Sequence, residues 1–409
     1  MILIIAALLA FYLAWNLGAN DVANAMGTSV GSRAITLTQA LVLAGILEFA
    51  GATLFGQRVA STLAKGVIQP EQFSQVPQTL LVGMVAVLLA GGLWLNLATA
   101  LRLPVSSSHA IVGALAGIAW VACGVQAINW SLIGIISLTW IGTPLVSGLL
   151  AAFFYALIQH WILKHPVPEK QLLEWVPWFS VALVGIFGAI VLPTVTQSLT
   201  LGSLPAHDLP LGIGVLATLG LTGMGWQWVN QNQPSSNQVE SFMGRFQVLS
   251  AACVAFAHGS NDVGNAIAPL ATIVQIEQTG AIPSGEFLIP PWTLILGGAG
   301  IVLGLAIWGK QVMMTIGEGI TPLKPSMGFC AELATATVIL LASRWGLPVS
   351  TSHALVGGVV GIGLINQQAS KQGIKWRTIG KIISAWFITI PIALGLAAFI
   401  FKVLEFYIF

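Results

Sequence analysis

The sequence predicts an all-α protein that passes through a membrane many times and contains two related parts. Of its 409 residues, only 7% are charged and 56% are hydrophobic, and the mean hydropathy is +0.90. Soluble domains carry about 25% charged residues, so this chain must expose much of its surface to lipid. Apolar runs such as 80–101 and 130–158 reach the roughly 20 residues that a spanning helix needs. Two polar motifs also occur twice, in the same order.

Charge and cysteine content exclude several classes of protein. The net charge is only +2, and the sequence has no cluster of basic residues of the kind that binds nucleic acid. Cys123, Cys253 and Cys330 lie in apolar surroundings without metal-ligand spacing, so we interpret them as buried core residues and expect no cofactor. The N-terminus is apolar from Ile2 and lacks a basic region, which favours a first membrane helix over a removed signal peptide.

Taken in order, the apolar segments predict the membrane helices. They lie near residues 2–28, 36–56, 79–101, 129–160, 175–195, 210–228, 246–274, 292–316, 328–345 and 378–405. Two shorter segments, about 103–124 and 347–366, open with proline and serine and are interrupted by glycine. That composition favours re-entrant or broken helices, which are tolerated at membrane depth only where they line a protein cavity.

The repeats divide the chain into halves. We expect a first half at 1–228, with motifs at 18–29 and 103–118, and a second at 246–409, with motifs at 258–269 and 347–362. A short polar connector, 229–245, joins them. Long internal repeats in a polytopic protein indicate a secondary transporter whose site lies at the repeat interface. The residues alone leave open whether the repeats are inverted.

The first duplicated motif predicts an anion site. Leu103–Ile118 and Leu347–Ile362 are 244 positions apart and identical at 11 of 16 positions. Proline followed by hydroxyl residues is typical of a helix start, where free N–H groups and the helix dipole favour anions. No arginine lies in the apolar part of either motif, so helix dipoles and a co-bound cation would have to offset the anion's charge. The hydroxyl candidates are Ser106, Ser107, Ser108, Ser350, Thr351 and Ser352.

The second duplicated motif predicts a cation site. Asp21 and Asp262 lie in apolar helices, where a carboxylate costs about 2.5 to 3.5 kcal/mol to insert. Each has asparagines at helical spacing, and carboxylate and amide oxygens suit a small hard cation or a proton-accepting carboxyl. These asparagines are Asn20, Asn24, Asn261 and Asn265. We expect sodium at Asn20, Asp21, Asn261 and Asp262, because neutral amide oxygens suit a metal cation better than a proton, which stays the alternative.

Four further intramembrane residues are candidates for coupling or gating. His109 and His353 are matched between the repeats, and we favour a structural role for them. Glu48 and Glu332 are not matched under the repeat offset. They could be ion ligands, proton carriers or groups that lock helices together.

Other classes of protein fit less well. Ser108–His109 and Ser352–His353 could be imagined as a nucleophile and base, but adjacent helical residues do not face each other. An ATP-driven pump needs a phosphate-binding loop, G-x-x-x-x-G-K-[ST], which the sequence lacks. A passive anion channel is the main alternative, and it would not respond to a cation gradient.

Gly18–Asn24 (GANDVAN), His258–Asn265 (HGSNDVGN) and the two Pro-Val-Ser-(Ser/Thr)-Ser-His elements resemble the PiT family of inorganic phosphate transporters. The resemblance covers almost the whole chain. It implies an all-helical fold of two inverted repeats, a homodimer, and a location in the inner or plasma membrane. It also implies symport of orthophosphate with sodium or, in many bacterial members, with protons, sometimes as a metal–phosphate complex. Some relatives carry sulfate.

The resemblance also implies roles for individual residues. Asp21 and Asp262 would bind the coupling cation, and Glu48 and Glu332 match acidic positions thought essential in the family. The groups implied to bind phosphate are Asn24, Asn265, Ser106, Ser107, Ser350 and Thr351. The large hydrophilic loop of animal members is absent here, which removes regulatory and receptor roles but not transport.

Overall fold

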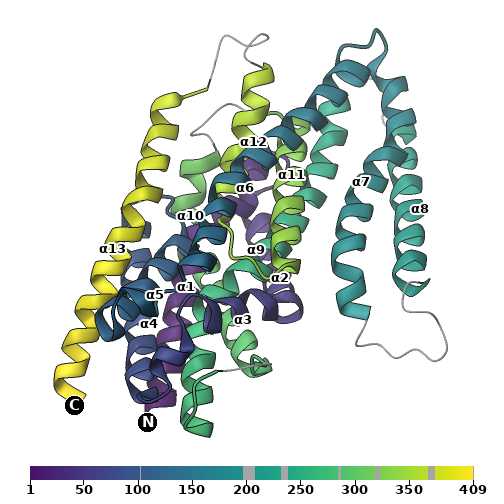
Figure 1. The fold of residues 1–409 in the computed structure, drawn as a ribbon. Helices are drawn as coiled ribbons and strands as arrows, with labels where there is room; N and C mark the ends of the chain where they lie inside the picture. Colours follow the sequence, from purple (N-terminus) through teal and green to yellow (C-terminus); the bar gives the residue numbers. More distant parts are fainter. Residues whose placement is uncertain are drawn as a thin grey trace.

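The structure, a computed structural model, describes residues 1–101, 103–196, 208–231, 238–283, 287–317, 323–366 and 374–408. Within these residues the regular elements are helices, and no β-strand forms (Figure 1). The α-helices are α1 (Ile2–Gly31), α2 (Leu37–Phe55), α3 (Gln57–Gly66), α4 (Pro77–Ala100), α5 (Ser107–Cys123), α6 (Trp130–Ile158), α7 (Pro168–Thr196), α8 (Asp208–Gln231), α9 (Gln238–Thr279), α10 (Pro291–Gly317), α11 (Pro325–Arg344), α12 (Thr351–Asn366) and α13 (Trp376–Ile408).

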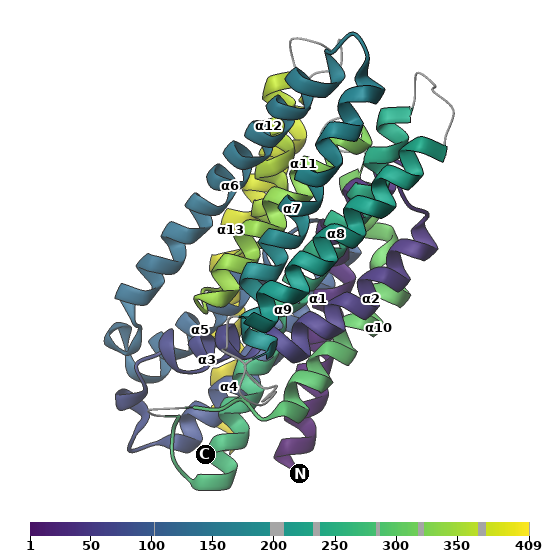
Figure 2. The same cartoon turned by 90° about the vertical axis from the view of Figure 1, so that its right-hand side faces the viewer.

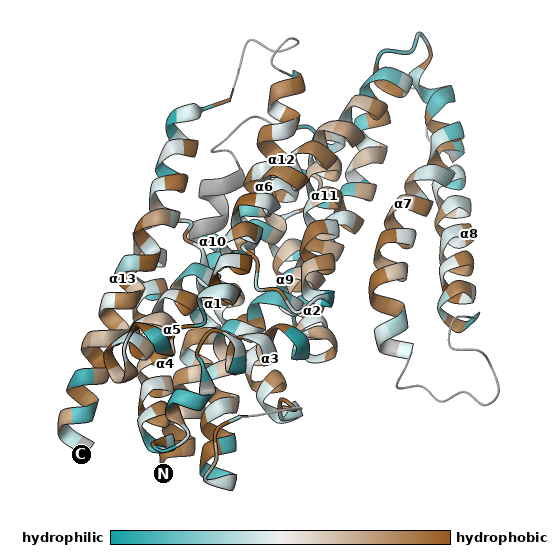
Figure 3. Cartoon of the chain, viewed as in Figure 1, coloured by the Kyte–Doolittle hydropathy of each residue, from teal (hydrophilic) through white to brown (hydrophobic). Residues whose placement is uncertain are grey.

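The predicted membrane fold is confirmed. Nine helices of the described ranges are long and apolar enough to cross a bilayer. Brown, hydrophobic segments make up much of the outer helices α6, α7 and α13, and teal is seen mainly toward their ends (Figure 3). The two serine segments form the short apolar helices α5 and α12, of 17 and 16 residues.

The two repeats are inverted with respect to each other. Helices α1, α4, α5 and α6 of the first repeat correspond in order to α9, α11, α12 and α13 of the second. Corresponding helices run in opposite directions: α6 ascends toward α7, whereas α13 descends to the C-terminus (Figures 1 and 2). The resemblance implied this arrangement, which the residues alone had left open.

The repeats interlock through close helix crossings. Helix α5 packs on α13, and α12 packs on α6, so each serine helix lies against the other repeat. A Cβ atom at Gly117 would overlap the carbonyl oxygen of Leu394 in α13, and one at Gly361 would overlap that of Gly148 in α6. Small residues at such crossings let backbones approach closely inside a membrane. These crossings bring the starts of α5 and α12 to the centre of the molecule.

Prolines within α6 and α7 leave three backbone carbonyls without their helical N–H donor, and side chains from other helices donate to these carbonyls instead. A proline lacks the N–H that would bond the carbonyl four residues earlier, and in lipid that carbonyl needs another donor. Pro144, Pro177 and Pro193 interrupt α6 and α7 in this way. The released carbonyls and their donors are Trp140 O with His353 Nδ1 (3.0 Å), Leu173 O with Trp226 Nε1 (2.8 Å) and Ala189 O with Arg344 Nη1 (3.0 Å).

Both ends of the segment predicted as a polar connector are helical. Residues 229–231 end α8 and residues 238–245 begin α9, while 232–237 lie outside the described residues. Helices α7 and α8 form a hairpin that stands to one side of the two repeats (Figure 1). The predicted boundaries of the two halves stay a prediction.

Candidate functional site

The two serine motifs form helix starts of the same design. Ser106 Oγ accepts the backbone N–H of His109 at 3.3 Å, and Ser350 Oγ accepts that of His353 at 3.3 Å. A hydroxyl bond to the third N–H is the usual way to cap a helix. Ser106 and Ser350 therefore fix the positions of the free N–H groups at the starts of α5 and α12.

These helix starts meet at a single carboxylate. Ser107 Oγ of α5 and Thr351 Oγ1 of α12 both donate to Asp262 Oδ2, at 3.3 and 3.4 Å. Ser108 Oγ reaches the carbonyl of Val349 at 2.8 Å, so it joins the first serine motif to the second. Helices that begin 244 residues apart in sequence thus present their N-termini to one buried space.

The other serine of the second motif stays within its own helix start. Ser352 Oγ lies 3.0 Å from Ser350 Oγ. Its equivalent in the first repeat, Ser108, bonds across the repeat interface instead. All six predicted hydroxyl residues are buried, at 0 to 3% exposure, around the junction of α5 and α12.

Asn24 and Asn265 each contact the serine helix of the other repeat. Asn24 Nδ2 of α1 donates to Asp21 Oδ1 at 3.0 Å and lies 3.5 Å from Thr351 Oγ1 of α12. Asn265 Nδ2 of α9 lies 3.5 Å from Ser108 Oγ of α5. Amide groups therefore border both hydroxyl clusters, as a site for an oxyanion requires.

Asn20 holds the turn that precedes the first serine motif. Its Nδ2 donates to Thr99 Oγ1 at 3.1 Å and to the carbonyl of Leu103 at 3.2 Å. The amide nitrogen is therefore committed to the α4–α5 turn, while the amide oxygen is not.

Asn261 holds the matching turn before the second motif. Its Nδ2 donates to Ser343 Oγ at 3.0 Å and to the carbonyl of Leu347 at 3.1 Å, and its Oδ1 accepts the N–H of Val349 at 3.2 Å. This asparagine positions the serine motif by three bonds. Sodium ligation by Asn20 or Asn261 stays a prediction.

The buried oxygens fit a hard cation. Within the described part of the chain, five side-chain oxygens of the two Asn-Asp motifs are buried without a hydrogen-bond partner. These atoms are Asn20 Oδ1, Asp21 Oδ2, Asn24 Oδ1, Asp262 Oδ1 and Asn265 Oδ1. Carboxylate and amide oxygens suit hard cations such as sodium, so the donor set agrees with the predicted cation site.

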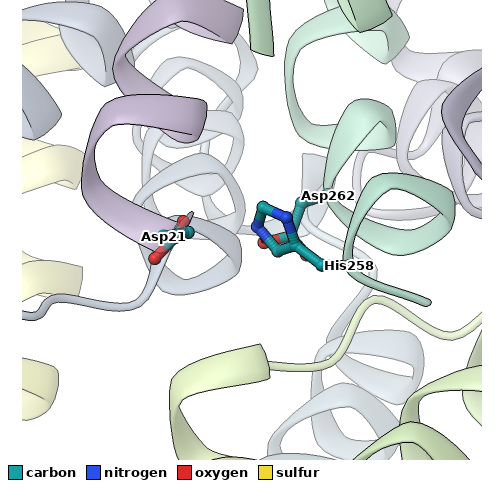
Figure 4. Close-up of side chains that lie close together, drawn as sticks. All are labelled: Asp21, His258 and Asp262. Carbon is teal, nitrogen blue, oxygen red and sulfur yellow. The ribbon is translucent and has the colours of Figure 1, made fainter. Parts of the chain in front are cut away.

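A histidine completes this cluster. One ligand atom each of Asp21, His258 and Asp262 lies within 4.8 Å of the others, and the side chains project into the space between α1 and α9 (Figure 4). All three residues are buried. Two carboxylates this close favour a bound cation between them.

His258 also joins Asp262 to Glu48. Its Nδ1 lies 3.1 Å from Glu48 Oε2, and its Nε2 lies 3.1 Å from Asp262 Oδ2. A close crossing of α2 and α9 makes this possible, because a Cβ atom at Gly259 would overlap the carbonyl oxygen of Glu48. Of the two unmatched carboxylates, Glu48 is therefore linked to the predicted cation site through one side chain, that of His258.

Glu332 lies in a separate cluster of donors. Its Oε1 accepts Thr28 Oγ1 at 2.5 Å, Ser29 Oγ at 2.6 Å and Gln247 Nε2 at 3.1 Å. Its Oε2 accepts Ser250 Oγ at 2.7 Å. The carboxylate thus joins α11 to both α1 and α9, which are the helices that carry the Asn-Asp motifs.

Comparison with known proteins identifies the family. A profile of the phosphate transporter family matches residues 17–397. The chain belongs to this family. It is 38% identical over 426 residues to inorganic phosphate transporter 2-1, chloroplastic, of Arabidopsis thaliana, a match that covers 95% of this chain and 70% of that protein. A solved structure named "The sodium-dependent phosphate transporter" is similar over 99% of both chains, with a TM-score of 0.91 and 35% identity.

Membership of the phosphate transporter family confirms several predictions. The chain is an integral, multi-pass membrane protein that transports phosphate, and it is not an enzyme. The resemblance to the PiT family is confirmed as well. The anion site at the hydroxyl-rich helix starts of this phosphate transporter stays a prediction.

Sequence reasoning about this transporter missed His258. The motif around it was recognised, but its imidazole was not singled out. A signal was present, since His258 precedes Asp262 by one helical turn while the equivalent position in the first repeat is Leu17. An unmatched ionisable residue next to a matched one is a departure from the repeat that a function could explain.

The matched histidines of the transporter lie just behind the serines. His109 Nδ1 lies 3.2 Å from the carbonyl of Trp386, and His353 Nδ1 lies 3.0 Å from that of Trp140. The two imidazole rings are 4.8 Å apart in an edge-to-face arrangement, and each also contacts a tryptophan ring. Their contacts bind each serine helix to the long helix of the other repeat, in agreement with the structural role that we favoured.

Proposed function

We propose that this phosphate transporter imports inorganic phosphate by symport with sodium. The observation that carries the proposal is the meeting of Ser107 and Thr351, at the starts of two helices, on one oxygen of Asp262. Phosphate would bind to the hydroxyls of both serine motifs, to the amides of Asn24 and Asn265, and to the free N–H groups of α5 and α12.

The shared hydroxyls give a physical basis for coupling. A hydroxyl has one proton to donate, and those of Ser107 and Thr351 are directed to Asp262. A cation held by Asp262 would withdraw negative charge from this carboxylate and weaken both hydroxyl bonds to it, so the two hydroxyl protons would become available to phosphate. The cation also reduces the cost of placing an anion in the membrane interior.

Sodium is favoured over other cations by the uncommitted oxygens at Asp21 and Asp262 and by the solved neighbour, which is sodium-dependent and 35% identical. Proton coupling is the second candidate, because Glu48, His258 and Asp262 form a continuous chain of ionisable groups. In that case the carboxylates would carry protons and need no metal ligands.

Uptake of labelled phosphate into proteoliposomes tests the proposal. We expect a sodium gradient at equal pH to drive accumulation, and Asp262→Asn to abolish it. Accumulation driven only by a pH gradient would show that the coupling ion is the proton and not sodium. A phosphate flux that is independent of both gradients would indicate a channel. Sulfate is included as a competitor, because its exclusion separates a phosphate carrier from a sulfate permease.

The hydroxyls are tested in the same vesicles. Ser107→Ala and Thr351→Ala should each raise the half-saturation concentration for phosphate several-fold, since one donor among several is lost. Ser74→Ala, which removes an exposed hydroxyl that bonds only the carbonyl of Glu71, is the matched control. Unchanged half-saturation in both site variants would place phosphate elsewhere.

We also propose that the transporter is a homodimer in the lipid bilayer. The proposal rests on the family resemblance. Light scattering of the protein in detergent measures the mass of the assembly, and a mass of one chain would contradict a stable dimer.

A further inference from the structure

A cavity outside the central site is lined by several cationic side chains. It has a volume of about 760 Å³ and lies among the end of α2, the length of α3 and the end of α11. Arg58, Lys65 and Arg344 line it, together with Gln57, Ser61, Thr62 and Thr194. No carboxylate is among the described residues of its wall. An anion in this cavity would therefore meet positive charge and hydroxyl donors.

The two arginines are held in place by backbone carbonyls. Arg58 Nη1 donates to the carbonyl of Arg344, the last residue of α11, at 2.7 Å. Arg344 Nη1 donates at 3.0 Å to the carbonyl of Ala189, which Pro193 leaves without its helical donor. A guanidinium has five N–H donors, so one anchoring bond fixes each group and leaves further donors for an anion. Anchoring lowers the entropy that binding must overcome.

The cavity borders the second serine motif. Gly346, in its wall, begins the turn that reaches Ser350 four residues later. The backbone of Gly346 has a φ of +70°, and a Cβ atom there would lie 2.9 Å from Thr62 Oγ1 of α3. The turn is therefore packed directly on α3, beside Arg58. An anion that left the cavity along this turn would reach the start of α12.

We propose that this cavity is a receiving site where inorganic phosphate binds, between Arg58 and Arg344, before it moves to the serine helices. The proposal rests on phosphate transport through those helices. Clefts lined by one sign of charge raise the local concentration and the association rate of the opposite ion by about 10 to 1,000-fold. The hydroxyls and amides of the central site have no formal positive charge, so attraction from a distance falls to the arginines. Binding in the cavity has to be weak, since the anion must leave again.

Salt dependence of uptake tests the proposal. We would measure kcat/KM for labelled phosphate in vesicles of neutral phosphatidylcholine, at a constant cation gradient and at low and high ionic strength. Arg58→Gln should lower kcat/KM about tenfold at low salt, weaken the salt dependence because one of three cations is lost, and leave the maximal rate close to wild type. Arg58→Lys, which keeps the charge, should retain most of the salt dependence. Lys170→Gln, at an exposed cation in the first turn of α7, is the matched control.

The same experiment separates the other outcomes. Equal kcat/KM and equal salt dependence in wild type and Arg58→Gln would overturn the proposal. If Arg58→Gln does not fold, Lys65→Gln is held to the same criterion, because it removes a charge from the same wall. Failure of the proposed function looks different, since wild-type protein would then show no cation-driven uptake in any vesicle.

A phospholipid headgroup offers the same phosphate chemistry, and its effect is measured by adding phosphatidylglycerol to the vesicles. If the cavity holds a lipid, wild type and Arg58→Gln will have the same kcat/KM in neutral vesicles and differ only with the anionic lipid. That result would overturn the receiving site. A tenfold difference already present in neutral vesicles supports it.

Discussion

Replacing Glu332 by glutamine distinguishes a structural role for this carboxylate from a role in coupling. The sequence allowed Glu332 to be an ion ligand, a proton carrier or a group that locks helices together. In the structure four donors from two other helices surround it, and the residue is fully buried. That arrangement satisfies a carboxylate with no cation, so we expect Glu332 to lock α11 against α1 and α9.

The size of the effect follows from the bonds. A hydrogen bond to a charged acceptor contributes about 1.5 to 3 kcal/mol, and a neutral bond contributes about 0.5 to 1.5 kcal/mol. Glutamine can keep its oxygen at the position of Oε1, where three donors meet, and Ser250 can rotate to accept from the new amide. A loss of about 1 kcal/mol for each of three or four bonds predicts a total destabilisation of about 3 to 4 kcal/mol.

Thermal unfolding of the purified protein in detergent measures this loss, and uptake by the folded fraction measures coupling. Glu240→Gln is the matched control, because Glu240 also joins α9 to α11, through Ser326, but at a partly exposed position. We expect Glu332→Gln to unfold at a clearly lower temperature than Glu240→Gln while its folded fraction keeps cation-driven uptake. Wild-type stability combined with loss of cation dependence would refute the reasoning and make Glu332 a coupling group.

Three further predictions concern contacts that position the site. Gly259→Ala should force α2 and α9 apart, at an overpacking cost of about 1 to 3 kcal/mol, and so lower both the melting temperature and uptake. Gly212→Ala, which meets nothing within 4 Å, should behave as wild type in both measurements. Asn261→Ala removes three bonds from the α11–α12 turn, so the half-saturation concentration for phosphate should rise, and an unchanged value would show that the turn needs no such support. His353→Phe leaves the carbonyl of Trp140 without a donor and should destabilise the protein by about 1 to 3 kcal/mol. Adding Pro144→Ala restores a backbone N–H that can bond this carbonyl, so the melting temperature of the double variant should recover. A further fall in the melting temperature would contradict this account.

The membrane fold and the paired motifs could be predicted because their signals are local or repeated. Low charge and long apolar runs indicate spanning helices without reference to the rest of the chain. The capping role of Ser106 and Ser350 is likewise local, because each hydroxyl accepts the N–H of the residue three positions later. Duplication then indicated which buried polar residues belong together, and the structure brings Asp21, Asp262 and both serine motifs into one region.

What the sequence could not predict depends on crossings between distant helices. Glu48 meets His258 only because Gly259 lets α2 and α9 approach closely. The donors to Glu332 lie between 82 and 304 residues away in sequence. No periodicity within α11 contains that information.

Helical spacing also gave less detail than the structure. Helical spacing grouped Asn20 and Asn24 with Asp21, but Asn20 reaches the α4–α5 turn whereas Asn24 bonds Asp21. Consecutive residues on a helix do not face the same way. A residue beside the predicted ion site can therefore serve a neighbouring turn, and only the packing of α4 against α1 decides which it does.

The two aspartates are matched in sequence but not in surroundings, and this difference bears on how two substrates are coupled. Asp21 receives a bond from Asn24 of its own helix, whereas Asp262 contacts His258 and receives the hydroxyls of both serine helices. In the proposed symport, a cation at Asp21 would act mainly through the field at the site. In the same scheme, a cation at Asp262 would weaken hydroxyl bonds from both repeats at once. Since the repeats run in opposite directions, one carboxylate that holds both helix starts can respond to a cation and change the phosphate-binding groups on the two halves together.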